Sequence, residues 1–173
     1  MAFSLGSGTT PNTSGGTYAS WTFREQAKFF DIVTYTGTGV GRTVSHNLGS
    51  VPGCMIVKRT DTTGNWEVFH RAIQSTPASS ADYAIQLNLT NAAAISSVWD
   101  SGTPPTASVF TVGSGATVNA SGGTYVAYLF AHDAGGFGTS GTDNVISCGS
   151  YVGNGLTAGP QVTLGYEPQL GIA

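Results

Sequence analysis

The stretch "HNLGSVPGCMIVKR" (residues 46–59) decides the fold class, because it places a Leu-Gly-x-x-Pro turn directly before an apolar run. Glycine adopts backbone angles that other residues avoid and proline fixes its own φ, so the pair predicts a turn with Gly49 at positive φ. The run 54–57 then predicts a strand that passes through a core. Lys58 and Arg59 follow as strand neighbours, so their side chains point to opposite faces of a sheet.

Similar short runs recur along the chain, separated by turn residues such as "DTTGN" (61–65). Many short strands with this punctuation are typical of antiparallel sheets packed face to face. The only helical signals, at 23–30 and 90–97, are barely two turns long and need tertiary support. We therefore predict an all-β fold, an antiparallel β-sandwich or jelly-roll-like module. Strands are expected at residues 29–37, 54–59, 66–71, 83–89, 108–113 and 124–130, with weaker candidates at 144–151 and 161–164.

Two internal repeats organise the chain. The segment "SGGTYASWTF" (14–23) matches "SGGTYVAYLF" (121–130), with an offset of 107 residues. The segment "YTGTGVGRTVSHNLGSVPGCMIV" (35–57) matches "YVGNGLTAGPQVTLGYEPQLGIA" (151–173), with an offset of 116 residues. The Leu-Gly-x-x-Pro turn therefore marks the start of a structural unit. Its recurring residues are Leu48, Gly49 and Pro52 in the first copy and Leu164, Gly165 and Pro168 in the second.

The repeats divide the chain into one complete module with a partial repeat at each end. The predicted organisation is an N-terminal arm with an orphan strand of a preceding repeat (1–28), a central β-sandwich module (29–130), a Gly-rich linker (131–143) and a partial second repeat (144–173). An unpaired strand exposes backbone donors and acceptors. We therefore expect both terminal segments to lie in a sheet with strands of the central module or of a neighbouring copy.

Charged residues make up only 9% of the chain, against roughly 25% in an average soluble domain. The formal net charge is −3 and the six cations are scattered, so we expect no nucleic-acid partner. No apolar run approaches the ~20 residues that span a bilayer, so we expect no membrane insertion, and no signal peptide is visible. A low charge also means little repulsion between copies, which suits an assembling protein.

Residues that commonly carry catalysis are few and scattered. The histidines are His46, His70 and His132, no G-x-S-x-G motif is present, and the nine acidic residues show no paired pattern. Cys54 and Cys148 form no C-x-x-C or Cys/His cluster, which argues against a zinc site. We therefore predict that the chain is not an enzyme and uses no metal or other cofactor. The cysteines are interpreted as two buried thiols, with a disulfide as the alternative.

The candidate residues for contact with a partner or a ligand are Lys58, Arg59, Trp66 and His70. Because the two cations face opposite sides of their strand, one of them is expected at a strand end, at an interface or in a salt bridge, with Asp61 or Glu67 as its partner. Trp66 and Phe69 lie three positions apart and also face opposite sides. One of these two rings must therefore lie on an outer face or at an interface. The aromatic residues either form a platform that stacks on sugars or fill the core.

The joint pattern resembles a repeat of structural proteins from tailed bacteriophages, particularly marine and cyanobacterial phages. The resemblance covers the chain from about residue 17 to its end. It rests on the Leu-Gly-x-x-Pro turn followed by "CMIVKRTD" (54–61), on the Trp66 and His70 that come next, on the stretch from Trp99 through Pro104 to Phe110, and on "SGGTYVAYLF" (121–130).

The resemblance implies a β-sandwich repeat in a virion structural protein of the tail-fibre or tail-appendage type, located in the phage particle and more often in the tail than in the head. It implies other copies of the chain and other virion proteins as partners, with a host surface glycan as a further one. The alternatives are a carbohydrate-binding, lectin-like module, a capsid decoration protein, or a self-assembling filament subunit linked by strand exchange.

Overall fold

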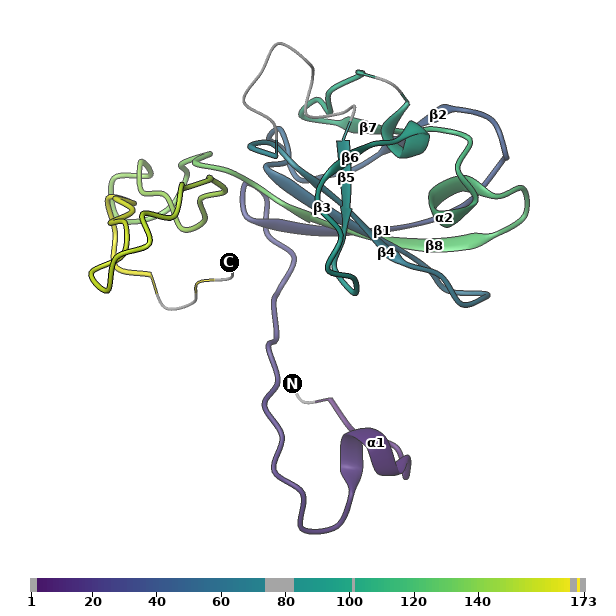
Figure 1. The fold of residues 1–173 in the computed structure, drawn as a ribbon, viewed down its shortest axis with the longest axis horizontal. Coiled ribbons are helices and arrows are strands. Elements are labelled where there is room, and N and C mark those ends of the chain that lie inside the picture. Colours follow the sequence, from purple (N-terminus) through teal and green to yellow (C-terminus); the bar gives the residue numbers. More distant parts are fainter. Residues whose placement is uncertain (1–2, 74–82, 101, 169–170, 172–173) are drawn as a thin grey trace.

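The computed structural model describes residues 3–73, 83–100, 102–168 and 171, and its strands form two sheets that pack face to face (Figure 1). The larger sheet has six strands in the order β1-β8-β3-β4-β5-β6, and the smaller sheet pairs β2 with β7. In the described part of the chain every pairing of these strands is antiparallel. The prediction of an all-β, sandwich-like fold is therefore confirmed.

All the strands lie in the central part of the chain. They are β1 (Phe30–Thr36), β2 (Arg42–Ser45), β3 (Cys54–Arg59), β4 (Trp66–His70), β5 (Tyr83–Gln86), β6 (Ala94–Ile95), β7 (Val109–Val112) and β8 (Thr124–Phe130). The helices are short: α1 (Thr9–Asn12), α2 (Ala116–Asn119) and the 3-10 helix η2 (Ser97–Trp99). Among the described residues, none of the helices has the length and apolarity needed to cross a membrane.

Strand β8 shows how the sequence divides between the two faces of the larger sheet. It lies between β1 and β3, and its residues alternate with a period of two. Tyr125, Ala127 and Leu129 are buried in the core, whereas Val126 and Tyr128 lie half-buried on the outer face. The core between the sheets includes Tyr35, Met55, Val57 and Phe69 from the larger sheet, Val44, Phe110 and Val112 from the smaller sheet, and Leu48, Trp99 and Val118 from the connections.

The Leu-Gly-x-x-Pro turn anchors the start of β3. Leu48 is fully buried, and its carbonyl accepts a hydrogen bond from the Lys28 amide at 2.6 Å. Gly49 has φ 68°, as predicted, and Pro52 is buried. The turn therefore fixes the entry of the chain into the sheet and brings it against the residue that precedes β1.

In the second copy of the turn the glycine has the same left-handed conformation as in the first, but the residues around it are less buried. Gly165 has φ 81°, while Leu164 is half-buried and Pro168 is exposed. The left-handed glycine therefore follows from the local sequence, since it forms with and without a core beside it.

The predicted strands of the central module are confirmed. The ranges 54–59 and 124–130 are observed to the residue, and 29–37, 66–71 and 108–113 are each shorter by one residue at one or both ends. The range 83–89 ends earlier, at Gln86, and strands β2 and β6 were not predicted.

Neither of the two weak helical signals, at 23–30 and 90–97, corresponds to an α-helix in the structure. Residues 94–95 form β6 because they pair with β5, and in the segment 23–30 a turn bridges Gln26 to Phe30. In each segment pairing to a neighbour outweighs a weak helical preference.

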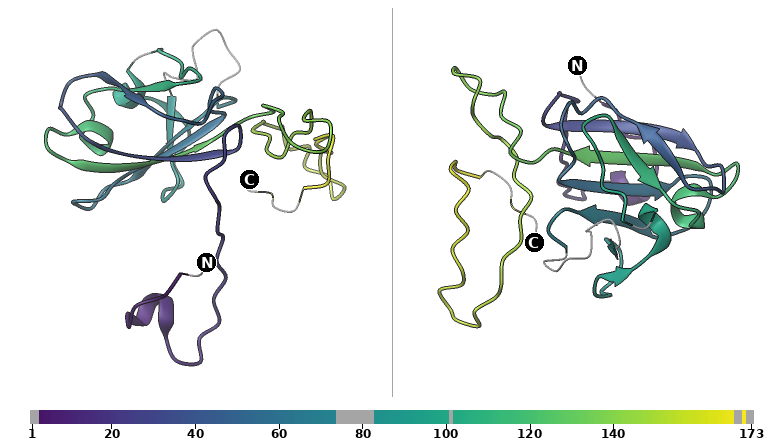
Figure 2. Two further views of the ribbon diagram at one scale, coloured as in Figure 1. Left: turned by 180° about the vertical axis from the view of Figure 1, so that it is seen from behind. Right: turned by 90° about the horizontal axis from the view of Figure 1, so that it is seen from above.

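The two terminal segments leave the sandwich in different directions (Figures 1 and 2). The N-terminal arm runs outward from β1, and the segment after β8 lies beside the sandwich. The described residues of 14–23, 144–151 and 161–164 form no strand, so these expectations are wrong for the single chain. Their sequences have the pattern of strands, but no strand within the described residues pairs with them. Pairing with a neighbouring copy remains a prediction.

Candidate functional site

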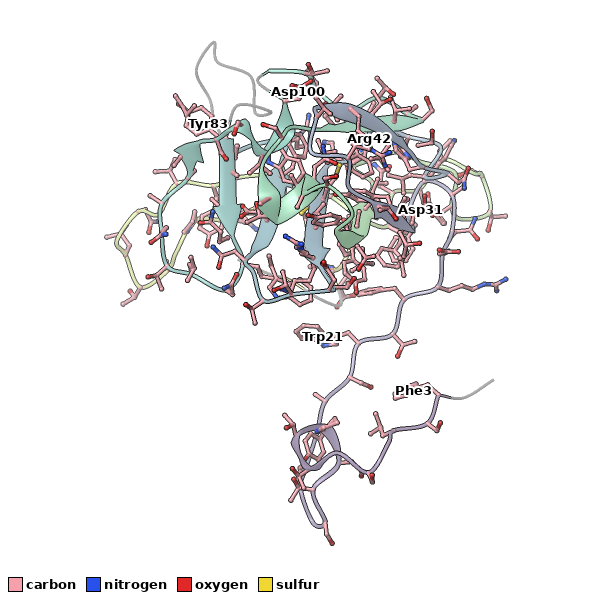
Figure 3. The ribbon with its side chains drawn as sticks, turned by 90° about the vertical axis from the view of Figure 1, so that its right-hand side faces the viewer. Phe3, Trp21, Asp31, Arg42, Tyr83 and Asp100 are labelled. Atoms are coloured by element: carbon pink, nitrogen blue, oxygen red, sulfur yellow. The ribbon has the colours of Figure 1, made fainter. Side chains whose placement is uncertain are left out.

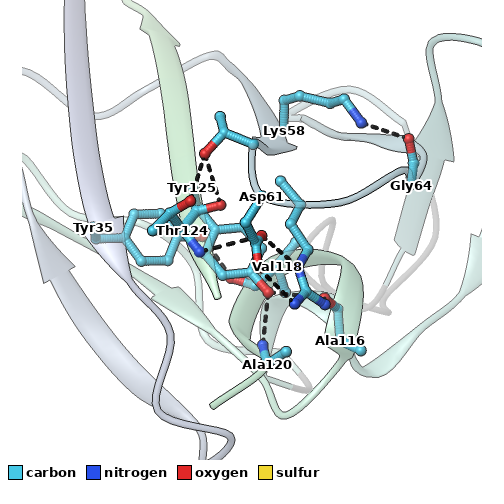
Figure 4. Close-up of polar contacts among 11 residues, drawn as sticks. Tyr35, Lys58, Asp61, Gly64, Ala116, Val118, Ala120, Thr124 and Tyr125 are labelled. Atoms are coloured by element: carbon cyan, nitrogen blue, oxygen red, sulfur yellow. Dashed lines mark hydrogen bonds and ion pairs between the residues drawn. The ribbon is translucent and has the colours of Figure 1, made fainter. Parts of the chain in front are cut away.

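Lys58 and Arg59 lie on opposite faces of the larger sheet, as their positions in β3 predicted. Arg59 forms a salt bridge with Asp61 through its Nε at 2.8 Å, and its guanidinium lies 5.9 Å from the ring centre of Tyr125 (Figure 4). The Asp61 carboxylate also accepts a hydrogen bond from the Thr124 amide at 3.3 Å. Hydrogen bonding to Arg59 lowers the pKa of Asp61 to about 2. The predicted salt bridge is thus present, and it joins the β3–β4 turn to the start of β8.

Lys58 belongs to an aromatic cluster on the outer face. Its ammonium lies 5.9 Å from the ring centre of Trp66, and the Trp66 ring stacks on Tyr128 at 6.4 Å with 19° between the planes. Lys58 also donates to the Gly64 carbonyl at 2.7 Å. Phe69 is 3% exposed in the core, so Trp66 is the member of the pair that faces outward. A half-buried ring with a cation beside it can stack on a sugar or on a partner's side chain.

The four predicted contact residues do not form one site. Trp66 and His70 lie on the same face of β4 but at its two ends, about 13 Å apart at the rise of a strand. His70 faces Cys54 in the register of β3 and β4, and Lys58 faces Trp66. Arg59 is on the other face of the sheet. Only Lys58 and Trp66 are brought together.

A pocket of about 450 Å³ opens beside the Leu-Gly-x-x-Pro turn. Gly49 and Pro52 of that turn line it, together with Phe69 of the core. Three nitrogen-bearing side chains also line the pocket: Lys28, Arg71 and His132. Pro104 and Pro105 contribute a rigid apolar part of the lining. The pocket thus combines a preformed apolar wall with positive charge, the usual composition of a site for an anionic ligand.

Backbone strain places Lys28 at this pocket. Lys28 has φ 65°, a conformation that side chains other than glycine rarely adopt. Its amide is held by the hydrogen bond to Leu48, and its side chain passes close to Gly136. Strained residues of this kind gather at binding sites, where the surrounding structure holds them.

The histidines near the pocket are neutral at pH 7. Burial lowers the pKa of His132 and that of His70, and the neighbouring Arg71 lowers both further. The Nδ1 of His132 accepts a hydrogen bond from the Cys148 amide at 3.0 Å, which fixes the ring. The positive charge of the pocket therefore comes from Lys28 and Arg71. No sequence pattern indicated this pocket, because its lining residues come from five separate segments.

Both cysteines are free. Cys148 is buried and Cys54 is partly buried. Burial raises the pKa of Cys54 to about 12 and that of Cys148 to about 11. Both thiols are free and at least partly buried in the structure, in agreement with the interpretation as two apolar thiols.

His46 has a structural role. It is 6% exposed, its Nδ1 accepts a hydrogen bond from the Leu48 amide at 3.2 Å, and its Nε2 lies 3.2 Å from the Thr106 carbonyl. Burial lowers its pKa. His46 thus holds the first turn of the repeat against the connection before β7. Within the described residues, no group of three or more His, Cys, Asp and Glu side chains gathers to hold a metal ion.

The chain matches the model of a family described as a domain of unknown function (DUF7483) over residues 2–172. The chain belongs to the DUF7483 family. Searches among curated proteins and among solved structures found no match. The DUF7483 match includes both terminal segments as well as the sandwich, so the arm and the segment after β8 are parts of the family's domain.

Proposed function

We propose that this chain is a structural subunit of a bacteriophage virion, a component of a tail fibre or tail appendage that assembles with other copies of itself. The resemblance of the sequence motifs to phage structural repeats supports the phage particle as its location. The low charge of the chain supports close contact between copies. A contribution to attachment at the host surface follows from the same resemblance.

The observation that carries the proposal is the exposure of large apolar side chains on both terminal segments. The arm exposes Phe3 and Trp21 at 64% and 71%, and both lie on the part of the arm that extends beyond the sandwich (Figure 3). The segment after β8 exposes Val152 and Leu156 at 87% and 69%. Isolated exposed apolar residues are normal, whereas whole segments of them favour a surface that a partner covers.

Sedimentation velocity across a hundredfold range of concentration tests the assembly. We expect species larger than the monomer, with a population that rises with concentration. A variant in which Trp21 and Leu156 are both replaced by Ser should shift the population toward the monomer. A matched control replaces Val40 and Ile95, which are exposed on the sandwich, and should leave the distribution unchanged. A wild-type protein that stays monomeric over the whole range contradicts the proposal.

The pocket of Lys28, Arg71 and His132 favours a second candidate function, the binding of an acidic glycan. Lys28 and Arg71 both line the pocket, so their charges would attract a carboxylate or sulfate group, and the apolar wall suits the carbon face of a sugar ring. This site also accounts for the strain at Lys28, which brings its side chain to the pocket. Glycan binding and assembly are compatible, since the exposed side chains of Phe3, Trp21, Val152 and Leu156 do not line the pocket.

Titration with N-acetylneuraminic acid and with a sulfated disaccharide, followed by NMR chemical shifts, tests the second candidate. We expect shifts at Gly49 and His132 that saturate, and a loss of binding of about tenfold or more in Lys28→Gln. Lys58→Gln is the matched control, because it removes the same charge from the outer face of the sheet. Absence of saturable shifts with both probes rules out this pocket as a site for acidic sugars.

A further inference from the structure

Residues 6–18 of the N-terminal segment have the same local structure as residues 113–125. Helix α1 and helix α2 cover the same span once the 107-residue offset of the sequence repeat is applied. Each helix follows a glycine N-cap, Gly8 with φ −62° and Gly115 with φ −59°. The turn after each helix holds a left-handed glycine, Gly15 with φ 76° and Gly122 with φ 75°.

The tyrosine after each turn ties the turn to its helix. The Tyr125 hydroxyl accepts a hydrogen bond from the Ala120 amide at 2.7 Å and donates to the Ala116 carbonyl at 2.8 Å. In the arm, the Tyr18 hydroxyl accepts from the Thr13 amide at 2.9 Å and lies 3.5 Å from the Thr9 carbonyl. Tyr18, Thr13 and Thr9 each lie 107 positions before their counterparts Tyr125, Ala120 and Ala116.

The asparagine at the end of each helix also makes the same contact. Asn119 donates to the Gly113 carbonyl at 2.8 Å, and Asn12 donates to the Gly6 carbonyl at 3.0 Å. The arm is therefore a preformed copy of the unit that ends in β8. The two copies differ in their surroundings, because Asn119 is fully buried and Asn12 is exposed.

The buried copy is docked on β1 and on the turn that follows β1. The Tyr35 ring stacks on Tyr125 at 5.1 Å, and its hydroxyl donates to the Val118 carbonyl at 2.7 Å. The Gly37 amide donates to the Gly123 carbonyl at 2.8 Å. These contacts define what the unit recognises: an extended strand with a tyrosine, followed two residues later by a glycine.

Residues 146–156 carry the sequence of that docking strand. Tyr151, Gly153 and Gly155 correspond to Tyr35, Gly37 and Gly39 at the 116-residue offset. The backbone agrees at the last of these positions, since Gly39 has φ 78° and Gly155 has φ 68°. Tyr151 is 57% exposed, so its ring has no partner comparable to Tyr125 in the described part of the chain.

The backbone hydrogen bonds of residues 146–156 lie along one edge of the segment and leave its other edge without partners among the described residues. The Ile146 carbonyl accepts from the Asp133 amide at 3.0 Å, and the Cys148 amide donates to His132. Phe30 of β1 corresponds to Ile146, and its backbone also bonds on the side away from β8, to Gln26. The backbone groups of the odd-numbered residues of β1 bond to β8. The odd-numbered positions 147, 149, 151 and 153 make no backbone hydrogen bond to another described residue. Their donors and acceptors form the edge that corresponds to the β8 side of β1.

We propose that the N-terminal segment of one copy adds as an antiparallel strand to residues 146–156 of a second copy. The register follows from β1 and β8. Tyr151 faces Tyr18, Gly153 faces Gly16, and the Tyr151 hydroxyl donates to the Pro11 carbonyl as Tyr35 donates to Val118. The proposal rests on the proposed function, since it identifies the contact through which copies assemble.

The attachment of the two segments to the sandwich favours a second copy over the same copy. Phe23 packs on the outer face of the larger sheet, with ring centres 5.4 Å from Phe30 and 6.0 Å from Phe130. Ile146 packs against the core on the inner side of that sheet. The two segments are therefore attached at opposite faces of the larger sheet. Each copy offers one donor and one acceptor, and such head-to-tail contacts build rings or filaments.

Cysteine cross-linking of the full chain tests the register. Ala19 and Ser150 occupy the positions of Val126 and Thr34, which face each other in β8 and β1 as a pair without mutual hydrogen bonds. Facing Cα atoms in such pairs lie about 4.5 Å apart, within the range of a disulfide. Ala19→Cys and Ser150→Cys proteins of different mass are mixed under mild oxidation. We expect a covalent dimer that contains one of each, and a covalent ladder from the double variant.

The matched control pairs Ala19→Cys with Gly149→Cys, whose side chain points to the other face of the strand. It should cross-link at least tenfold less. If the double variant yields only an internally linked monomer, the strand pairs within one copy and the proposal is wrong. If the wild type sediments as oligomers and the mixture gives no cross-link, copies assemble through another contact. A wild-type monomer contradicts the proposed function itself.

Substitution of Tyr18 and Tyr151, which stack on each other in the proposed contact, tests the association of copies by a second measurement. Tyr18→Ala and Tyr151→Ala should each weaken association by tenfold or more, and the double variant should be little worse than either single variant, because both remove the same contact. Val162→Ser is the control, since Val162 is exposed and lies outside the paired range. Unchanged association in both tyrosine variants overturns the proposal.

Discussion

Residues 6–18 and 113–125 share a sequence pattern and a local structure, yet only the second segment is part of a folded core. Tyr18 is 50% exposed, whereas Tyr125 is 2% exposed. The helix, the glycine turn and the tyrosine tether form in both, so local sequence is sufficient for them. The strand that follows exists only where β1 and β3 pair with it. A helix turn can thus form from its own residues, while a strand requires partners.

The largest expected difference between the two segments concerns their tyrosines. Tyr125→Ala removes a buried ring and two hydrogen bonds, so we expect it to lower the free energy of unfolding by about 3–5 kcal/mol. Tyr18→Ala should leave the unfolding of a dilute, monomeric sample unchanged. Urea denaturation of both variants measures the difference. Equal losses would mean that the arm belongs to the same cooperative unit as the sandwich.

Substitution of the asparagine in each segment should give a smaller difference in stability than substitution of the tyrosine. The Asn119 amide donates to Val40 and Gly113, at 2.7 and 2.8 Å, and its Oδ1 accepts from the Thr38 amide. Asn119→Ala removes these three hydrogen bonds and leaves the carbonyl of the buried Gly113 without this donor, at a cost of roughly 3 kcal/mol. Asn12→Ala loses one exposed hydrogen bond and should cost under about 0.5 kcal/mol. Thermal unfolding of the two variants at low concentration checks the contrast.

Substitution of the turn glycines measures how much the backbone conformation alone contributes to stability. A Cβ at Gly15 or at Gly122 meets no atom within 4 Å, so substitution by Ala at either position tests only the positive φ. Gly122→Ala should lower the stability of the sandwich by about 1 kcal/mol. Gly15→Ala should leave it unchanged. A loss of several kcal/mol at Gly122 would show that more than the backbone conformation is disturbed.

The sequence predicted the fold because alternation and turn residues act locally. The strand 124–130 was predicted to the residue, since its alternating apolar positions match the two faces of a sheet. Strand β2 was missed because "RTVS" has only one buried residue, Val44, and pairs with β7 far along the chain. Helix α2 was missed because a four-residue helix has no periodicity to detect.

The candidate site was harder to predict for a related reason. The salt bridge of Arg59 with Asp61 joins residues two positions apart, so sequence alone suggested it. The pocket joins Lys28 to Arg71 and His132, which only the sheet order brings together. No local pattern marks these three residues, so their proximity depends on the tertiary structure. The separation of the four predicted contact residues over two faces has the same cause.

The smallest expected effect is a dependence of stability on pH. It should come from the sandwich and the segment after β8, because the arm contains no histidine. Burial lowers the pKa of His46, His70 and His132 in the folded state. As the pH falls through about 6.5, the unfolded chain takes up protons that the folded chain does not. Stability should therefore fall between pH 7.5 and 5.5. Asp61, with a pKa of about 2, acts only in a lower range, as the pH falls below about 4.

Urea denaturation at pH 7.5 and at pH 5.5 measures this dependence, and a His46→Gln variant assigns part of it. His46 is the most buried of the three histidines. Its replacement should lower stability at both pH values and reduce the difference between them, because one of the groups that resist protonation is gone. The difference should be the same in a variant that carries Tyr18→Ala, since the arm contributes no titrating histidine. A pH dependence that changes with Tyr18 would instead couple the arm to the sandwich.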